Sequence, residues 1–170
     1  VQPEMAKRPV FGVSWQRCLY YCVWRGKRLP TEAEWERAAA GLEGRLYPWG
    51  NEPPDPGRAN FGKCCAVLAG RIFSEVGTYE SGKTPEGIYD MAGNAAEWVY
   101  DWYGKTYYQH SEYNNPKGPE KGKYHVIRGG AWNSYPYYMR STDRYGTNDG
   151  QDFYGIGCRC AKSASVSEGK

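Results

Sequence analysis

The sequence lacks long hydrophobic runs and carries little net charge, and each deficit excludes a class of protein. In 170 residues, apolar stretches such as residues 66–69 are far shorter than the roughly 20 residues that a membrane-spanning helix needs. The formal net charge is only +3, whereas proteins that bind polyanions usually concentrate basic residues on one face. We therefore expect one soluble domain with its own core, without membrane insertion and without nucleic acid as partner.

Histidine is almost absent as well. The chain has two, His110 and His125, so a mononuclear zinc or iron site that needs three histidines cannot be built from it. Phenylalanine is scarce, with 4 residues against 16 tyrosines and 7 tryptophans. Most rings therefore carry a polar group, which favours a binding surface, although a β-rich core lined with aromatic side chains is the alternative.

Residues 131–157 have an unusual composition. They include five Tyr, four Gly and three Asp, and they contain no Lys, Glu, Leu or Val. A core segment would not lack both Leu and Val, and a flexible linker would not hold five tyrosines. Aromatic residues mixed with small hydrogen-bonding residues are typical of an antibody paratope, so the segment is predicted to bind a ligand. The alternative is a tyrosine-rich loop packed on the fold.

The six cysteines allow two interpretations. Cys18 and Cys22 are four residues apart, which places them on one face of a helix, and Cys158 and Cys160 are two apart, which places them on one face of a strand. Two disulfides between that helix and that strand would indicate an oxidising compartment. The alternative is that these residues are small buried thiols.

Two helices are expected early in the chain. The first is predicted over about residues 15–24, with Ser14 as its N-cap. The second follows a capping box formed by Thr31 and Glu34 and runs to about residue 41.

The rest of the chain indicates short strands and loops. Residues 47–87 are rich in Gly and Pro, which predicts loops with short strands. Two helices followed by short strands indicate an α+β fold. Residues 163–170 are small and polar and are expected to form a flexible tail.

Residues 87–98 (GIYDMAGNAAEW) hold two acidic side chains around a Gly-Asn turn. Asp90 and Glu97 offer hard oxygen ligands, and the turn between them can direct backbone carbonyls to the same point. Calcium takes several oxygen ligands in a flexible geometry. The segment is therefore a candidate calcium site, and a solvated turn is the alternative.

Several motifs follow one another along the chain. They are VSW at 13–15, YCVWRGKRLPTEAEWE at 21–36, YPWGNE at 47–52, GNAAEW at 93–98, RGG at 128–130 and GCRCA at 157–161. Together they resemble the formylglycine-generating enzyme (sulfatase-modifying factor) family over about residues 9–162. The resemblance implies a C-type lectin fold of that subtype, with two early helices, short antiparallel strands and much irregular structure, in a single domain over residues 1–162. The family's usual N-terminal strands have no counterpart, which indicates a piece of a longer protein.

The enzymes of this family need two cysteines soon after the Arg-Gly-Gly motif, which bind copper and handle oxygen. Counting from Gly130 places Ser134 and Met139 at those positions, and neither side chain supplies a thiolate. The related iron-dependent sulfoxide synthases need three histidines. The resemblance therefore predicts that the domain is not an enzyme and binds no copper. The alternative is a formylglycine-generating-type oxidoreductase with a non-standard active site.

A non-enzymatic branch of the family resembles residues 131–157. These are the variable proteins of diversity-generating retroelements, above all their treponemal surface type, in which adenine mutagenesis makes the C-terminal region hypervariable. A stable scaffold there displays a diversified binding surface. The resemblance implies a fixed frame that includes Arg128, Gly129, Gly130, Trp132, Arg140 and Arg159. It implies a ligand-facing set of Ser134, Tyr135, Tyr137, Tyr138, Asp143, Tyr145, Thr147, Asn148, Asp152 and Tyr154.

Further expectations follow from the same resemblance. The family disulfide corresponds to Cys22 with Cys160, which leaves Cys18 with Cys158 as a second pair. The partner is expected to be a protein or surface ligand, and the location a bacterial cell surface, reached through a lipid anchor outside this chain. A structural calcium ion is implied, with ligands at Asp90, Gly93, Ala95 and Glu97.

Overall fold

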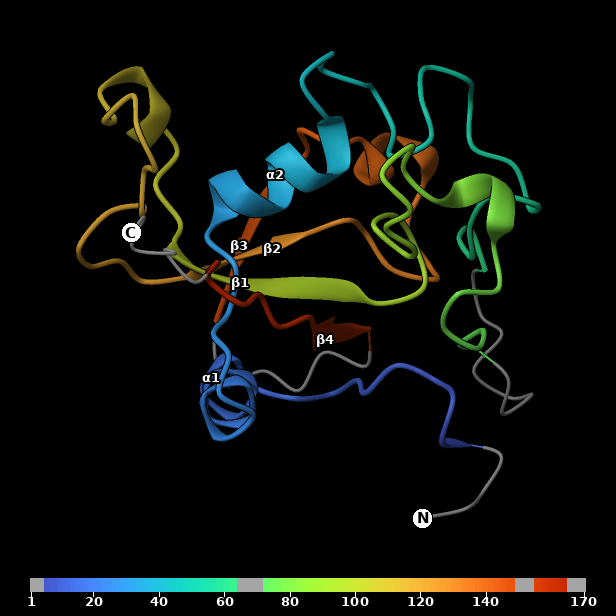
Figure 1. Cartoon of the computed structure of the whole chain (residues 1–170), viewed down its shortest axis with the longest axis horizontal. Helices are drawn as coiled ribbons and strands as arrows, with labels where there is room; N and C mark the ends of the chain where they lie inside the picture. Colours follow the sequence, from blue (N-terminus) through green and yellow to red (C-terminus); the bar gives the residue numbers. More distant parts are fainter. Residues whose placement is uncertain (1–4, 64–71, 149–154, 165–170) are drawn as a thin grey trace, which may run out of the picture.

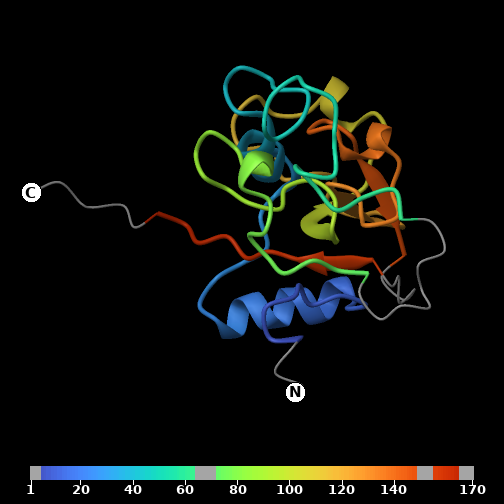
Figure 2. The same ribbon diagram turned by 90° about the vertical axis from the view of Figure 1, so that its right-hand side faces the viewer.

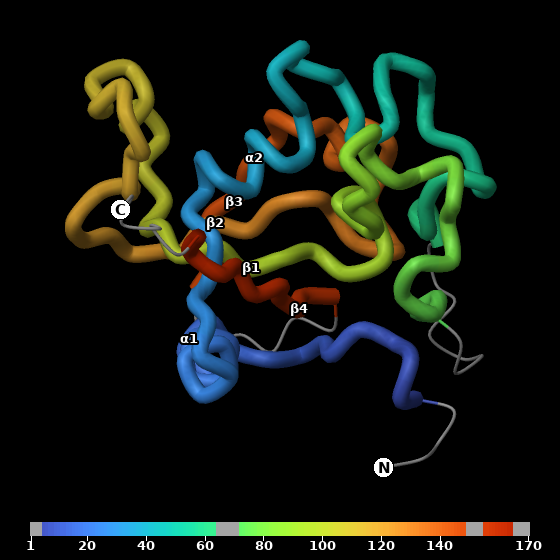
Figure 3. The backbone as a smooth tube through the Cα atoms, in the orientation of Figure 1, coloured from blue at the N-terminus to red at the C-terminus, as the bar shows by residue number. Residues whose placement is uncertain are grey.

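The structure, a computed structural model, describes residues 5–63, 72–148 and 155–164. Its main elements are two helices and a four-stranded sheet (Figure 1; the backbone alone is drawn in Figure 3). They are α1 (Trp15–Trp24), α2 (Glu32–Ala40), β1 (Ala96–Trp102), β2 (His125–Arg128), β3 (Tyr145–Thr147) and β4 (Ile156–Cys158). The predicted α+β class is confirmed.

Both helices begin where the sequence predicts. The Ser14 side chain accepts a hydrogen bond from the Arg17 amide at the start of α1. At the start of α2, Thr31 Oγ1 accepts from the Glu34 amide at 3.2 Å, and the Glu34 carboxylate accepts from the Thr31 amide at 2.9 Å. These caps satisfy backbone donors that the first turn of a helix leaves without partners.

The sheet has the strand order β3-β2-β1-β4 and is mixed. β1 pairs antiparallel with β2, and β2 pairs antiparallel with β3. β4 pairs parallel with β1, with Trp98 opposite Cys158, so the expectation of antiparallel strands is wrong for this pair. The physical reason lies in the path of the chain. β4 follows β3 in sequence, but the two strands lie at opposite edges of the sheet, so β4 is not joined to its neighbour β1 by the tight hairpin that would require an antiparallel pair.

The two helices cover opposite faces of the sheet. Successive side chains of a strand point to opposite faces, and on β1 Trp98 packs in a cluster with Cys18 of α1, whereas Val99 packs in a cluster with Trp35 of α2. Figure 1 shows α1 and α2 on either side of the sheet, and Figure 2 shows α1 lying alongside β4.

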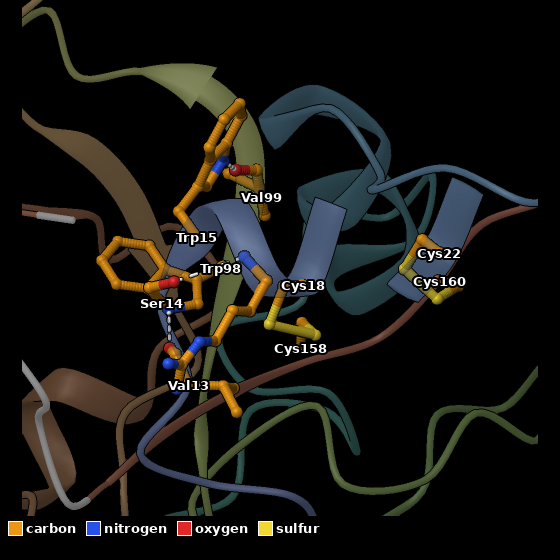
Figure 4. Close-up of a disulfide and its surroundings, with 10 residues drawn as sticks. Val13, Ser14, Trp15, Cys18, Cys22, Trp98, Val99, Cys158 and Cys160 are labelled. Atoms are coloured by element: carbon orange, nitrogen blue, oxygen red, sulfur yellow. Dashed lines mark hydrogen bonds between the residues drawn. A yellow bond between two sulfur atoms is a disulfide. The ribbon is translucent and has the colours of Figure 1, made fainter. Parts of the chain in front are cut away.

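Two disulfides join α1 to the segment at the end of β4 (Figure 4). Cys18 pairs with Cys158 at a Cα–Cα distance of 6.2 Å, and Cys22 pairs with Cys160 at 5.5 Å. This is the pairing that the family resemblance implied. β4 ends at Cys158, so Cys160 lies two residues beyond the strand rather than within it.

The long connections hold the short 3-10 helices η3 (Glu80–Gly82), η4 (Tyr107–Gln109) and η5 (Pro136–Met139). The short strands expected in residues 47–87 are not found in the described parts of that segment, where the one bridge pairs Tyr47 with Gly50. Its glycines and prolines favour turns over a strand ladder. In the described parts of the chain, no helix is long and apolar enough to cross a membrane.

Candidate functional site

A cavity of about 450 Å³ lies between the sheet and the segment that follows β2. Its apolar floor comes from strand residues, Ala96, Ile127 and Ile156, and its other walls include Ser134 and Tyr145. Four residues of the predicted ligand-facing set line it: Ser134, Tyr138, Asp143 and Tyr145. The strand residues of the floor are not recognisable in the sequence, because apolar residues at these positions look like those of any buried strand.

Two glycines let the chain fold back over this cavity. Gly129 and Gly130 have φ angles of 86° and 67°, which favour glycine. A Cβ on Gly130 would lie 2.9 Å from the backbone oxygen of Tyr138, which is too close. The turn that follows is closed by Ser134, whose Oγ accepts from the Ala131 amide at 2.8 Å. The Arg-Gly-Gly motif therefore brings η5 to the mouth of the cavity.

Two arginines anchor this segment to α2. The side chain of Arg128 is fully buried, donates to the backbone oxygen of Ser141 at 2.7 Å and pairs with Glu32 and Glu36. Arg144 donates through Nε to Glu32 at 2.7 Å. Because the carboxylate of Glu32 is itself buried, the three groups hold one another in place. The loop between β2 and β3 thus has a rigid base.

Four tyrosines of the predicted set form an exposed cluster at the mouth, and we call Tyr135, Tyr137, Tyr138 and Tyr145 the tyrosine cluster. Tyr135 is 72% exposed and Tyr137 57%. The rings of Tyr138 and Tyr145 meet edge to face with centroids 5.3 Å apart, and Tyr138 makes the same kind of contact with Tyr137 at 5.5 Å. The Arg140 guanidinium lies 3.6 Å from the centroid of Tyr137.

Ser134, Asp143, Asn133 and Arg128 are the polar and charged residues, tyrosines aside, among the described residues that line the cavity. An oxygen of Asp143 lies 3.6 Å from Nη2 of Arg140, and burial raises the pKa of its carboxyl. Burial and the nearby Asp143 carboxylate also raise the pKa of the Tyr145 phenol above its ordinary value. Met139 does not line the cavity, and its side chain is fully buried in a cluster with Tyr47 and Ala92.

Of the remaining predicted residues, the structure describes two, and both lie outside the cavity. Thr147 is partly buried in β3 and Asn148 is exposed just after it, and neither lines the cavity. Asp152 and Tyr154 lie outside the described residues. The structure therefore brings together those members of the predicted set that lie between Ser134 and Tyr145, around η5 and β3.

The turn predicted to bind calcium lies apart from this cavity. Both oxygens of Glu97 accept hydrogen bonds from Arg159, each at 2.6 Å, and one also accepts from the indole of Trp35. The Asp90 carboxylate accepts from the Gly77 amide at 2.7 Å. No group of three or more His, Cys, Asp or Glu suited to a metal occurs among the described residues. Protein donors thus contact the carboxylates of Asp90 and Glu97, and calcium binding at Asp90, Gly93, Ala95 and Glu97 stays a prediction.

The architecture by itself defines the class of fold. Treponema denticola variable protein 1 has the same fold, with a TM-score of 0.77 over 93% of this chain and 72% of that one, at 24% sequence identity. The domain has the C-type lectin fold of the formylglycine-generating-enzyme subtype.

The sequence then gives the family. The model of the sulfatase-modifying factor enzyme 1-like domain matches residues 1–164, and the chain belongs to this family. The serine/threonine-protein kinase pkn1 of Chlamydia pneumoniae is 43% identical over 167 residues, which are 96% of this chain and 25% of that protein. The formylglycine-generating enzyme of Streptomyces coelicolor is 38% identical over 180 residues, covering 95% of this chain and 54% of the enzyme. The chain thus spans about a quarter and about half of these relatives.

Proposed function

We propose that this domain binds a ligand without catalysis, through a diversified surface formed by the tyrosine cluster and the cavity behind it. The observation that supports the proposal is that the loop between β2 and β3 combines exposed side chains with a buried, anchored base. Its tyrosines are exposed around an apolar cavity, while its base is held by the buried side chain of Arg128. Large apolar side chains exposed together usually mark an interaction site.

The physical argument is one of preorganisation. A tyrosine has few rotatable bonds, so it loses little entropy on binding while contributing apolar area and a hydroxyl. A loop fixed on α2 by Arg128 and Arg144 has less freedom to lose than an unanchored one, which leaves more of the contact energy for affinity. Changes of the exposed side chains alter the ligand without disturbing the core, as a hypervariable surface requires.

Ser134 and Met139 support the proposal that the domain does not catalyse a reaction. The family resemblance assigns the copper-binding cysteines to Ser134 and Met139, and the latter side chain is buried away from the cavity. Among the described residues the four cysteines are all in disulfides, so none offers a thiolate to copper. No copper chemistry is therefore part of the proposal.

Partner and location complete the proposal. The partner is a protein or another surface ligand that fills the apolar cavity and contacts the tyrosine cluster. The location is a bacterial cell surface, held there by a lipid anchor outside this chain. Two disulfides in one small domain support an oxidising environment.

Sequencing the genomic locus tests the diversification. We expect a near-copy of the codons for residues 128–160, differing at adenines, beside a reverse transcriptase gene. A locus with neither feature would contradict adenine mutagenesis and would leave the tyrosine cluster a fixed surface.

A second candidate is an oxidoreductase of the formylglycine-generating type with a non-standard active site. It is favoured by the 38% identity to the Streptomyces coelicolor enzyme. Incubating the protein with copper and a cysteine-containing sulfatase peptide, followed by mass spectrometry, separates the two. Conversion of the cysteine to formylglycine would overturn the non-enzymatic proposal, and an unchanged peptide is the expected result.

A further inference from the structure

The cavity behind the tyrosine cluster carries an acidic side chain, Asp143. Among the described residues that line this cavity, Arg128 and Asp143 are the charged ones. The guanidinium of Arg128 is already matched, because it pairs with the carboxylates of Glu32 and Glu36. The Asp143 carboxylate therefore decides which charge the cavity favours in a ligand.

One oxygen of the Asp143 carboxylate has no partner among the described residues. Its Oδ1 lies 3.6 Å from Nη2 of Arg140, which is longer than a hydrogen bond. Its Oδ2 is buried, and no described residue donates a hydrogen bond to it. A buried acceptor without a partner costs free energy, which a donor on a bound ligand recovers.

The rest of the cavity suits a cation at the end of an aliphatic chain. Its floor is apolar, with Ala96, Ile127 and Ile156, and burying methylene groups against such a floor is favourable. Tyr138 and Tyr145 line the same cavity, and the faces of tyrosine rings attract cations. Its volume of about 450 Å³ is typical of a ligand site.

A primary ammonium fits this carboxylate better than a guanidinium does. The fork of an arginine recognises a carboxylate through both oxygens, and here Oδ1 of Asp143 already faces Arg140. An ammonium is a compact charge, so it can pair with the remaining oxygen alone. The indole N–H of Trp132 also borders the cavity and is buried without a partner among the described residues. A peptide carbonyl of the same ligand can accept from it.

We propose that the cavity receives a lysine side chain of a partner protein, with its methylene groups against the apolar floor and its ammonium on Oδ2 of Asp143. The proposal rests on the proposed ligand-binding function and names the chemistry of the ligand. It makes position 143 a determinant of specificity, because a different side chain there changes the charge that the cavity selects.

Three probes that differ in one side chain test the proposal. They are the Nα-acetyl N-methylamides of lysine, of norleucine, which is lysine without its ammonium, and of glutamate. Each is titrated into the whole chain and followed by NMR, and the lysine probe is expected to bind with a Kd of about 1 mM. We expect it to bind about 10 to 100 times more tightly than the norleucine probe, since its ammonium satisfies a buried carboxylate oxygen. The glutamate probe is expected to bind more weakly than norleucine.

Asp143→Asn is the variant that should abolish the preference. We expect the lysine and norleucine probes to bind it within about twofold of each other, because the charge of the carboxylate is gone. The matched control is Asp55→Asn. Asp55 pairs with Arg58 three residues away, as Asp143 does with Arg140, but it is half exposed and does not line the cavity. This control is expected to keep the wild-type preference.

The outcomes separate this proposal from the function on which it rests. If the wild-type protein binds norleucine and prefers lysine by less than about fivefold, the cavity is a binding site but not one for an ammonium, and the proposal is wrong. If no probe binds, both the proposal and the role of the cavity in ligand binding are wrong. A lysine preference that Asp143→Asn retains also overturns the proposal. The wild-type titrations decide the matter by themselves if that variant does not fold.

Discussion

Tyr137 and Met139 belong to the same 3-10 helix, η5, but only the tyrosine faces solvent. Tyr137 is 57% exposed, whereas Met139 is fully buried. Replacing Met139 by alanine leaves a cavity in the core, which costs about 2–5 kcal/mol of unfolding free energy. Replacing Tyr137 removes an edge contact with Tyr138 and the stacking of Arg140, both near the surface, which costs about 1 kcal/mol.

These energies convert into well-separated melting temperatures. In a domain of this size, 1 kcal/mol corresponds to about 2–4 °C in Tm. At about 3 °C per kcal/mol, the middle of this range, we expect Met139→Ala to lower Tm by about 6–15 °C and Tyr137→Ala by about 3 °C. The assay is thermal unfolding followed by circular dichroism, with both variants at the same protein concentration.

The comparison can fail in two ways. If Tyr137→Ala costs as much as Met139→Ala, the ring is a structural part of the loop and the tyrosine cluster is not a free surface. If Met139→Ala is neutral, the burial of this side chain does not stabilise the fold, and the contrast on which the proposed function rests is lost.

Two more predictions concern pH and the disulfides. Burial raises the pKa of Asp101 to about 6, against 3.8 ordinarily, although the Glu32 amide donates to its carboxylate. The native state thus binds this proton more tightly than the unfolded state does. The resulting contribution to the free energy of unfolding, at most about 3 kcal/mol, is fully present below pH 3.8 and is lost as the pH rises to about 6. Urea unfolding between pH 4 and 7 should show wild type losing stability relative to Asp101→Asn as pH rises; parallel curves would refute this. The disulfides close nearly the same loop, with separations of 140 and 138 residues. Replacing one pair by alanine should therefore cost well under half of the roughly 4–5 kcal/mol lost when both are replaced, because the remaining bond still closes that loop; equal and additive losses would show that local packing dominates.

Much of the fold could be predicted from short stretches of the sequence. Ser14 and the Thr31–Glu34 capping box mark the starts of α1 and α2, because caps satisfy donors within a few residues of themselves. The composition of residues 131–157 pointed to the loop that carries the tyrosine cluster. The sequence motifs predicted the family to which the comparisons then assigned the chain.

Other features depended on contacts between distant segments. The parallel pairing of β4 with β1 follows from the path of the chain, which an alternation of residue types does not encode. The cavity floor joins Ala96, Ile127 and Ile156 from three strands, and no local pattern distinguishes these residues from other core positions.

The sequence by itself determined the helices with their caps, the family and the loop that carries the proposed binding residues. Tertiary structure alone decided which members of that loop face outward, so that Tyr137 is exposed while Met139, two residues on, is buried. It also decided that Glu97 pairs with Arg159, 62 residues away. The physical reason is the same in both cases: burial and charge pairing depend on which distant groups arrive at the same place, and only the folded chain brings them there.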